Sequence, residues 1–196
     1  MLDYLATCPN DGIVYRASDM ILAAHSGAGF HNESKGRSWA GAHIFLSEDD
    51  PIPRFKISIL SIYLIIKFFI TSAAEYELAA LYITAQKLVP MRQTLIEMGW
   101  PQPPTPIQTD NTTAEGVVNN KIVTKKLKSM DLRLHFLRCR GAQKQFCFYW
   151  DKEPNNWGDY HTKQHPPVYH EAKRPLFAGC AQILLRVLRA QRKGTY

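Results

Sequence analysis

Short runs of apolar residues predict strands in the first third of the chain. We expect strands over residues 21–25 and 39–46, and a third strand within residues 57–70. The third run, ISILSIYLIIKFFIT, is the most apolar in the chain, and its β-branched and aromatic content predicts a buried strand. It is shorter than the ~20 residues that a membrane-spanning helix needs, and Lys67 interrupts it. We therefore predict no membrane segment.

The apolar period becomes helical after Ser72, which is available as the helix N-cap. Pro90 is expected to end or kink this helix, with a second piece continuing to Gly99. Beyond the proline-rich linker PQPPTP, we predict a strand at residues 107–109, helices near 113–119 and 129–139, a strand at 145–150, a polar loop at 151–160 and a final short helix. This order of elements predicts an α/β fold in which helices flank a mixed sheet.

Composition and charge narrow the class of protein. The 196 residues are 45% hydrophobic and 21% charged, which is typical of one globular domain and not of a disordered chain. The formal net charge of +7 favours an anionic partner, either nucleic acid or an acidic membrane surface. The four cysteines form no CxxC pair, and the N-terminus has no secretory signal, so we expect free thiols and an intracellular location.

Three acidic residues lie where separate elements would direct them toward one cleft. Glu77 is in the first turns of the long helix, Asp110 ends a short strand, and Asp159 opens the last helix. Gathered carboxylates repel one another unless a cation lies among them, and hard oxygen ligands suit Mg²⁺ or Mn²⁺. Position alone leaves the alternative open that each residue is a solvated or helix-capping charge.

A basic segment lies in the second half of the chain. Residues 121–144 contain a single acidic residue, Asp131, and eight basic residues. The basic residues are Lys121, Lys125, Lys126, Lys128, Arg133, Arg138, Arg140 and Lys144. Such a cluster predicts phosphate contacts, and an ordinary solvated helix face is the alternative. The C-terminal tail at 178–196 is also basic, and its pattern fits either an amphipathic helix for an anionic surface or a terminal helix docked on the fold.

Four segments carry a family resemblance, in order along the chain: SAAEYELAAL at 72–81, TDNTTA at 109–114, SMDLRLHFLR at 129–138 and NNWGDYHTK at 155–163. They are similar to a Ser-x-x-Glu-x-Glu helix start, an Asp-Asn-x-x-Ala turn, an Asp-Ile/Leu-Arg-x-His-Phe segment and an Asn-x-Ala-Asp-x-x-Thr-Lys ending. Over residues 4–177, the chain resembles the ribonuclease H domain of copia-type retrotransposon polyproteins.

The resemblance implies a ribonuclease H-like fold, a five-stranded mixed sheet flanked by helices. It also implies hydrolysis of the RNA strand of an RNA–DNA hybrid by two Mg²⁺ (or Mn²⁺) ions held by Glu77, Asp110 and Asp159, with Asn111 helping to position the hybrid. The organisation it implies is the end of a reverse transcriptase connector at residues 1–18, the ribonuclease H-like domain at 19–177 and a basic tail at 178–196. The chain then resembles one piece of a larger polyprotein.

The segment Ser26–Phe30 departs from the family frame. The family ends its first strand in Ser-Asp-Ala-x-aromatic, and Gly27 stands where its metal-bridging Asp would be. A phosphate-binding glycine loop is a poor alternative, because the third glycine at the required spacing is missing. We therefore expect impaired catalysis, and two function classes stay open: a weakly active hydrolase, or a non-catalytic nucleic-acid-binding remnant or degenerate gene fragment.

Overall fold

The protein divides into two compact units, Ser18–Gln164 and the combination of Met1–Ala17 with His165–Tyr196. The structure, a computed structural model, describes residues 12–13, 15–29, 37–50, 53, 56–67, 70, 72–122, 131–152, 155–163 and 165–177. The described residues of the second unit include the helix α5 (Pro167–Phe177). The tail at 178–196 lies outside the described residues, and the predicted boundaries at residues 18 and 177 stay predictions.

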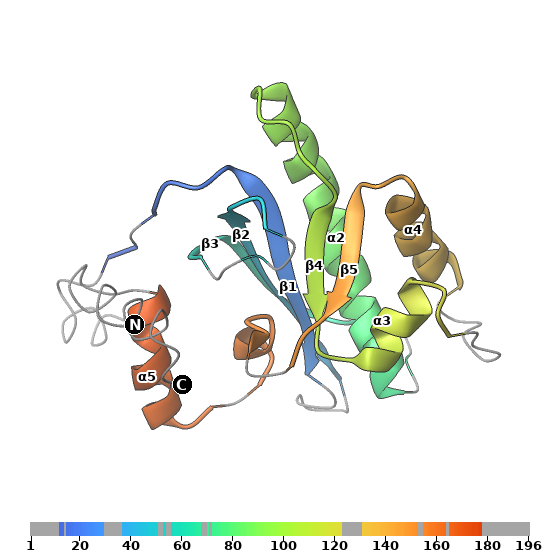
Figure 1. The fold of residues 1–196 in the computed structure, drawn as a ribbon. Coiled ribbons are helices and arrows are strands. Elements are labelled where there is room, and N and C mark those ends of the chain that lie inside the picture. The colour runs from blue at the N-terminus through green and yellow to red at the C-terminus, as the bar shows by residue number, and fades with distance from the viewer. Residues whose placement is uncertain are drawn as a thin grey trace. The chain divides into compact units, whose positions relative to one another are not determined.

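The first unit is built on a five-stranded mixed sheet (Figure 1). Its strands are β1 (Ile21–Gly29), β2 (Trp39–Ser47), β3 (Ser58–Ile65), β4 (Thr105–Thr109) and β5 (Phe146–Trp150), in the spatial order β3-β2-β1-β4-β5. The first three strands pair antiparallel, whereas β4 pairs parallel with β1 and with β5. The predicted mixed sheet is therefore confirmed.

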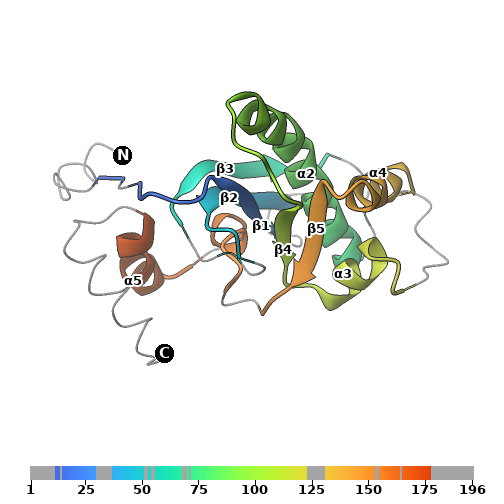
Figure 2. The same cartoon turned by 45° about the horizontal axis from the view of Figure 1, so that its top comes forward.

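One face of the sheet packs against three helices (Figure 2). They are α2 (Ala73–Glu97), α3 (Thr112–Val118) and α4 (Asp131–Ala142). Alternate residues of β1, Leu22 and Ala24 among them, join side chains of all three helices in one buried apolar cluster. Burial of this cluster holds α2 against β1, the strand that carries Gly27.

The long helix α2 begins as predicted but does not end at its proline. The Ser72 side chain accepts a hydrogen bond from the backbone N–H of Glu75 at 3.3 Å, so the predicted N-cap is confirmed. Of the two predicted effects of Pro90, an end of the helix was wrong, because α2 runs through to Glu97, whereas a kink at Pro90 stays a prediction. Leu88 and Leu95, buried on either side of Pro90, anchor both parts of the helix to the core, which offsets the lost backbone hydrogen bond.

The apolar run at 57–71 forms a strand, but the prediction that this strand is buried was wrong. β3 is the outermost strand of the sheet, and Ile59, Leu60, Tyr63 and Leu64 are all exposed. Its apolar content fitted the strand but could not reveal that the strand would have one neighbour. Among the described residues, no helix has the length and apolar content needed to cross a membrane.

The other face of the sheet holds a buried cluster of aromatic rings around two histidines. The His25 ring lies 5.1 Å from Phe45 and 6.3 Å from His43, centroid to centroid. His25 Nδ1 accepts from the backbone N–H of Trp157 at 3.3 Å, and His43 Nε2 bonds to the Lys56 carbonyl at 2.8 Å. Burial lowers the pKa of His25 to about 3 and that of His43 to about 4, so both imidazoles are neutral at pH 7.

Acid is expected to destabilise the fold through these histidines. Because their pKa is lower in the folded chain than the ordinary 6.5, their contribution is complete above pH 6.5 and is lost as pH falls toward 4. His43→Gln keeps a hydrogen-bond donor without titrating, so it should remove on the order of 2 kcal/mol of the loss in unfolding free energy between pH 7.5 and pH 5. Urea unfolding at the two pH values measures this.

The exposed His135 offers a matched control for the change from histidine to glutamine, and His135→Gln should leave the unfolding free energy at pH 7.5 within about 0.5 kcal/mol of the wild-type value. Equal acid sensitivity of wild type and His43→Gln would contradict the prediction.

Candidate active site

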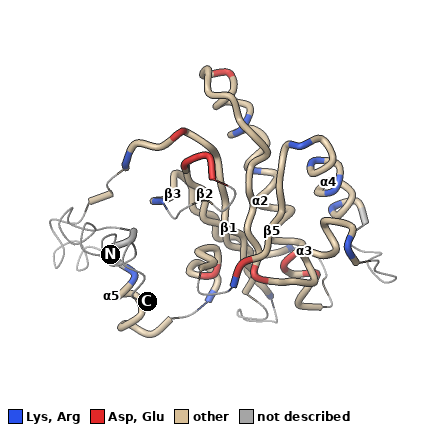
Figure 3. The backbone as a smooth tube through the Cα atoms, viewed as in Figure 1, with Lys and Arg blue, Asp and Glu red and all other residues tan. Residues whose placement is uncertain are grey.

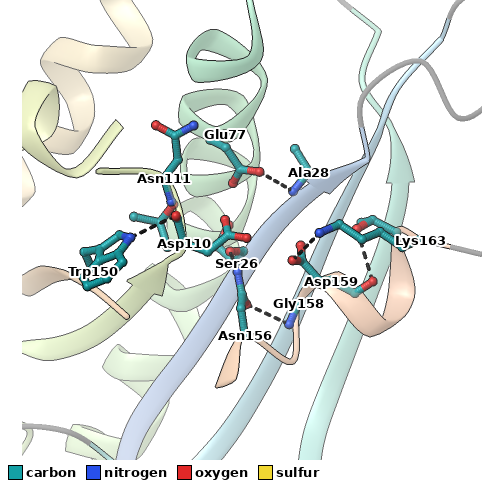
Figure 4. Close-up of polar contacts among 12 residues, drawn as sticks. Ser26, Ala28, Glu77, Asp110, Asn111, Trp150, Asn156, Gly158, Asp159 and Lys163 are labelled. Atoms are coloured by element: carbon teal, nitrogen blue, oxygen red, sulfur yellow. Dashed lines mark hydrogen bonds and ion pairs between the residues drawn. The ribbon is translucent and has the colours of Figure 1, made fainter. Parts of the chain in front are cut away.

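The three predicted carboxylates come from different elements to one region beside β1 (Figure 4). Glu77 lies in the first turns of α2, and Asp110 directly follows β4. Asp159 is the first residue of the short 3-10 helix η3 (Asp159–His161). Glu77 and Asp159 are buried, whereas Asp110 is half-buried.

Glu77 is held against β1 by a hydrogen bond. The backbone N–H of Ala28 donates to its Oε1 at 3.0 Å, while the buried Oε2 has no hydrogen-bond partner. Burial raises the pKa of Glu77 well above its usual range, and repulsion from Asp110 and Asp159 raises it further. The carboxyl group therefore lies in a place that disfavours negative charge.

Asp159 experiences the same repulsion and has one counter-charge. Burial, followed by the charge of Asp110, raises the pKa of Asp159 to about 7. Lys163 Nζ lies 2.9 Å from Asp159 Oδ2 and opposes this rise, while Asp159 Oδ1 is buried without a hydrogen-bond partner. A single ammonium thus offsets only part of the repulsion among three carboxylates.

The donor types, but not their arrangement, suit a hard divalent cation. Oxygen-only ligands and the two unpartnered oxygens of Glu77 and Asp159 are what Mg²⁺ or Mn²⁺ would use. However, within the described ranges no three His, Cys, Asp or Glu side chains are grouped so that they could hold a metal ion. The ion pair with Lys163 also occupies the second oxygen of Asp159.

The space beside Gly27 is filled by Asp159. A Cβ built on Gly27 would lie 2.2 Å from Asp159 Oδ1 and 3.0 Å from the Asp159 backbone nitrogen. Real Cβ atoms do not approach other atoms as closely as the first of these distances. The position where the family frame has its bridging Asp is therefore occupied by another carboxylate, so no side chain fits there unless Asp159 moves.

Two further glycines bring the segment 156–162 close to the sheet. A Cβ on Gly158 would lie 2.6 Å from the Gly27 backbone nitrogen, and one on Gly41 would lie 2.5 Å from the Gly158 carbonyl oxygen. Asn156 fixes this approach, since its Nδ2 donates to the Ser26 carbonyl at 2.8 Å and its Oδ1 accepts from the Gly158 N–H at 3.0 Å. The segment and β1 can lie this close because neither Gly27 nor Gly158 has a side chain.

Asn111 has a structural use at this site. Its Oδ1 accepts from the Ala114 N–H at 2.9 Å and caps α3, so Asn111 and not Asp110 is the N-cap. Its predicted contact with a hybrid stays a prediction. On the other side of Asp110, the Trp150 indole N–H donates to the Asp110 carbonyl oxygen at 2.9 Å (Figure 4).

In the predicted phosphate-contact cluster, Arg133, Arg138 and Arg140 lie on α4 and Lys144 lies just beyond it (Figure 3). Lys121 instead follows α3 and forms an ion pair with Glu115. Arg138 donates from Nε and Nη2 to the Val117 carbonyl, at 3.1 and 2.6 Å, and so joins α4 to the end of α3. Arg140 donates to Gln145 Oε1 at 2.9 Å, and the Arg133 guanidinium lies 5.9 Å from the centre of the Tyr82 ring. Lys125, Lys126 and Lys128 lie outside the described residues.

Two residues at the site had no role assigned from sequence. Lys163 stands within the NNWGDYHTK segment, four residues after Asp159, so helical spacing could have indicated the ion pair. Trp150 ends β5 opposite Thr109, one residue from Asp110, and only the strand pairing reveals that neighbourhood.

Comparison with known proteins places the fold. No protein-family model matches the sequence, and a search of curated proteins found no match. Among solved structures, LC11-RNase H1, isolated from compost by a metagenomic approach, is similar with a TM-score of 0.54 at 12% identity, over 73% of this chain and 93% of that chain. The protein has a ribonuclease H-like fold.

A second similar structure is LC11-RNase H1 in complex with an RNA/DNA hybrid, with a TM-score of 0.54 at 11% identity, over 72% of this chain and 93% of that chain. The ribonuclease H-like fold confirms the predicted fold class. Sequence identities this low support a shared fold but not a shared activity.

Gly158→Ala is expected to destabilise the first unit. The added methyl group would meet backbone atoms of Ser26 and Gly27 at 2.8 and 2.6 Å, and such overpacking costs about 1–3 kcal/mol. Gly141→Ala in α4 is the matched control, because its Cβ would make an ordinary 3.7 Å contact with Phe148. Urea unfolding compares the two; a Gly158→Ala variant as stable as wild type would show that the segment does not lie this close to β1.

Proposed function

We propose that this chain is a ribonuclease H-like domain of copia-type retrotransposon origin that binds RNA–DNA hybrids and cleaves them feebly or not at all. The observation that supports this proposal best is the arrangement of acidic side chains at β1. Glu77, Asp110 and Asp159 gather there, and the Asp159 carboxylate fills the side-chain space of Gly27. The site has three of the four acidic groups that the resembling family uses, and it has no space for the fourth.

The nucleic-acid partner is supported by several independent features. The four sequence segments that resemble the copia-type domain fall on α2, the β4–α3 turn, α4 and η3 of a ribonuclease H-like fold. A protein of this fold, LC11-RNase H1, has been solved with an RNA/DNA hybrid. The net charge of +7 and the basic side chains of α4 favour a phosphate-rich partner.

Impaired hydrolysis follows from the electrostatics of the site. Two-metal hydrolysis depends on divalent ions that activate a water and stabilise the leaving oxygen, and among the described residues no three His, Cys, Asp or Glu side chains are grouped so that they could hold such an ion. In this chain the family's bridging carboxylate is absent, and Lys163 neutralises part of Asp159. Losing one preorganised electrostatic contact typically costs several kcal/mol of transition-state stabilisation. The proposed domain therefore binds the hybrid but hydrolyses it poorly.

The second candidate is a degenerate gene fragment with no selected activity, and the facing glycines at 27 and 158 favour it, since both depart from the family frames. For either candidate we propose an intracellular location and an ancestral place beside a reverse transcriptase. Hybrid binding distinguishes the two, because a fragment without a role has no reason to keep it.

Cleavage of a labelled RNA–DNA hybrid in Mg²⁺ or Mn²⁺ tests the catalytic part. We expect the wild type to match the no-protein background, and Glu77→Gln and Asp110→Asn to match the wild type. Gly27→Asp alone should not restore cleavage, since Asp159 fills the space that the new side chain needs. An active ribonuclease H in the same buffer serves as the positive control. Robust wild-type cleavage that disappears in Glu77→Gln would refute the proposed inactivity.

Salt dependence of hybrid binding tests the binding part. Because phosphate contacts release counterions, log Kobs should fall linearly with log salt concentration. Removing one contact by Arg133→Gln or by changing the exposed Lys144 to Gln should reduce the slope by roughly 0.7–0.9 per contact. The exposed Lys87 on α2 provides the control substitution Lys87→Gln, which should leave the slope unchanged. A salt response that is flat for every protein would rule out the phosphate contacts.

A further inference from the structure

Trp150 is a large aromatic side chain left exposed beside the acidic site. It is the last residue of β5, pairs with Thr109 on β4, and is 47% exposed. The preceding residue on the strand, Tyr149, instead turns its hydroxyl toward Gln108 Oε1 at 3.3 Å. A single exposed aromatic ring is ordinary on a protein surface, but this ring ends the strand whose partner, Thr109, directly precedes Asp110 of the acidic site.

The indole is held in place. Its N–H donates to the Asp110 carbonyl oxygen at 2.9 Å, so the only polar atom of the side chain is satisfied (Figure 4). The backbone that follows is fixed as well, because the Asp151 N–H donates to the Thr109 carbonyl at 3.2 Å and Asn155 Nδ2 donates to Asp151 Oδ2 at 2.9 Å. A ring with a satisfied donor and a fixed backbone offers its apolar surface with little entropy left to lose on binding.

We propose that Trp150 is a stacking contact for a base of the nucleic acid bound across the acidic site. This inference rests on the proposed function, because it names the part of the ligand that one end of the same site recognises. The free face of an unpaired or terminal base stacks on indole whatever the sequence, so the contact would strengthen binding without specifying a base.

The charges around Trp150 favour a base over a phosphate. The carbonyl that accepts from the indole N–H belongs to Asp110 itself, and Asp151 follows Trp150 directly. Two carboxylates repel a phosphate but leave the uncharged face of a base unaffected. Phosphates are then expected on the basic side chains of α4, and the stacked base at the end of β5.

Another exposed tryptophan provides the control. Trp100 is 44% exposed, close to Trp150 in exposure, but follows the end of α2 and precedes β4, whereas Trp150 lies where β4 and β5 end. Because β4 and β5 run parallel, the two tryptophans belong to opposite ends of the sheet. A general effect of losing a surface tryptophan would appear at both positions.

The experiment measures, by anisotropy at low salt, the affinity of the full chain for a fluorescently labelled 12-base-pair RNA–DNA hybrid that ends in a short single-stranded overhang. Trp150→Ala should weaken binding by about 5- to 100-fold, the range found when one base–aromatic stack is removed. Trp150→Phe keeps a stacking ring but not the indole N–H, so it should stay within about 3-fold of wild type. Trp100→Ala should bind as wild type does. The salt slope of Trp150→Ala should equal that of wild type, since stacking releases no counterions.

Each outcome has a separate meaning. If wild type binds and Trp150→Ala binds equally well, the stacking contact is refuted while the proposed function stands. If Trp150→Phe is as weak as Trp150→Ala, the hydrogen bond to Asp110 and not the ring matters, and the stacking contact is also refuted. If wild type does not bind the hybrid, the proposed function fails and the inference falls with it. Circular dichroism and urea unfolding of both Trp150 variants establish that they fold.

Discussion

The approach of the segment 156–162 to β1 and β2 determines what surrounds the acidic site. Three glycines, Gly27, Gly41 and Gly158, make the approach possible, because a Cβ on any of them would lie within 2.6 Å of an atom across the contact. Asn156 closes it with a hydrogen bond to the Ser26 carbonyl. As a result, the Asp159 carboxylate lies in the space that a side chain at position 27 would need.

In that arrangement, nearby positive charge and hydrogen-bond donors offset only part of the repulsion among the carboxylates. Glu77 and Asp159 both have raised pKa values because they are buried and because other acids surround them. A hydrogen bond from Ala28 and an ion pair from Lys163 offset some of the repulsion. The Lys163 ammonium provides positive charge beside Asp159, as a metal ion provides positive charge beside the carboxylates of a metal-dependent nuclease. An ammonium neutralises charge but neither activates water nor stabilises a leaving oxygen as a divalent ion does.

Binding and catalysis depend on different parts of the first unit. Catalysis needs a complete set of carboxylates within one small volume, so a single missing side chain disables it. The nucleic-acid binding proposed here would draw on contacts spread over a wide surface, such as the basic side chains of α4 and the exposed ring of Trp150. Binding of that kind does not require a complete set of carboxylates.

The sequence by itself determined features that depend on neighbours along the chain. Ser72 caps α2 because its side chain reaches a backbone N–H three residues away, and the strands around Ile21 and Trp39 follow from local apolar patterns. The segments that contain Glu77, Asp110 and Asp159 could be recognised in the same way. Tertiary structure decided the rest: β3 became an exposed edge, Pro90 stayed inside a continuous helix, His25 and His43 were buried neutral, and Asp159 filled the space beside Gly27. Each of these depends on which distant element becomes a neighbour, and local spacing carries no information about that.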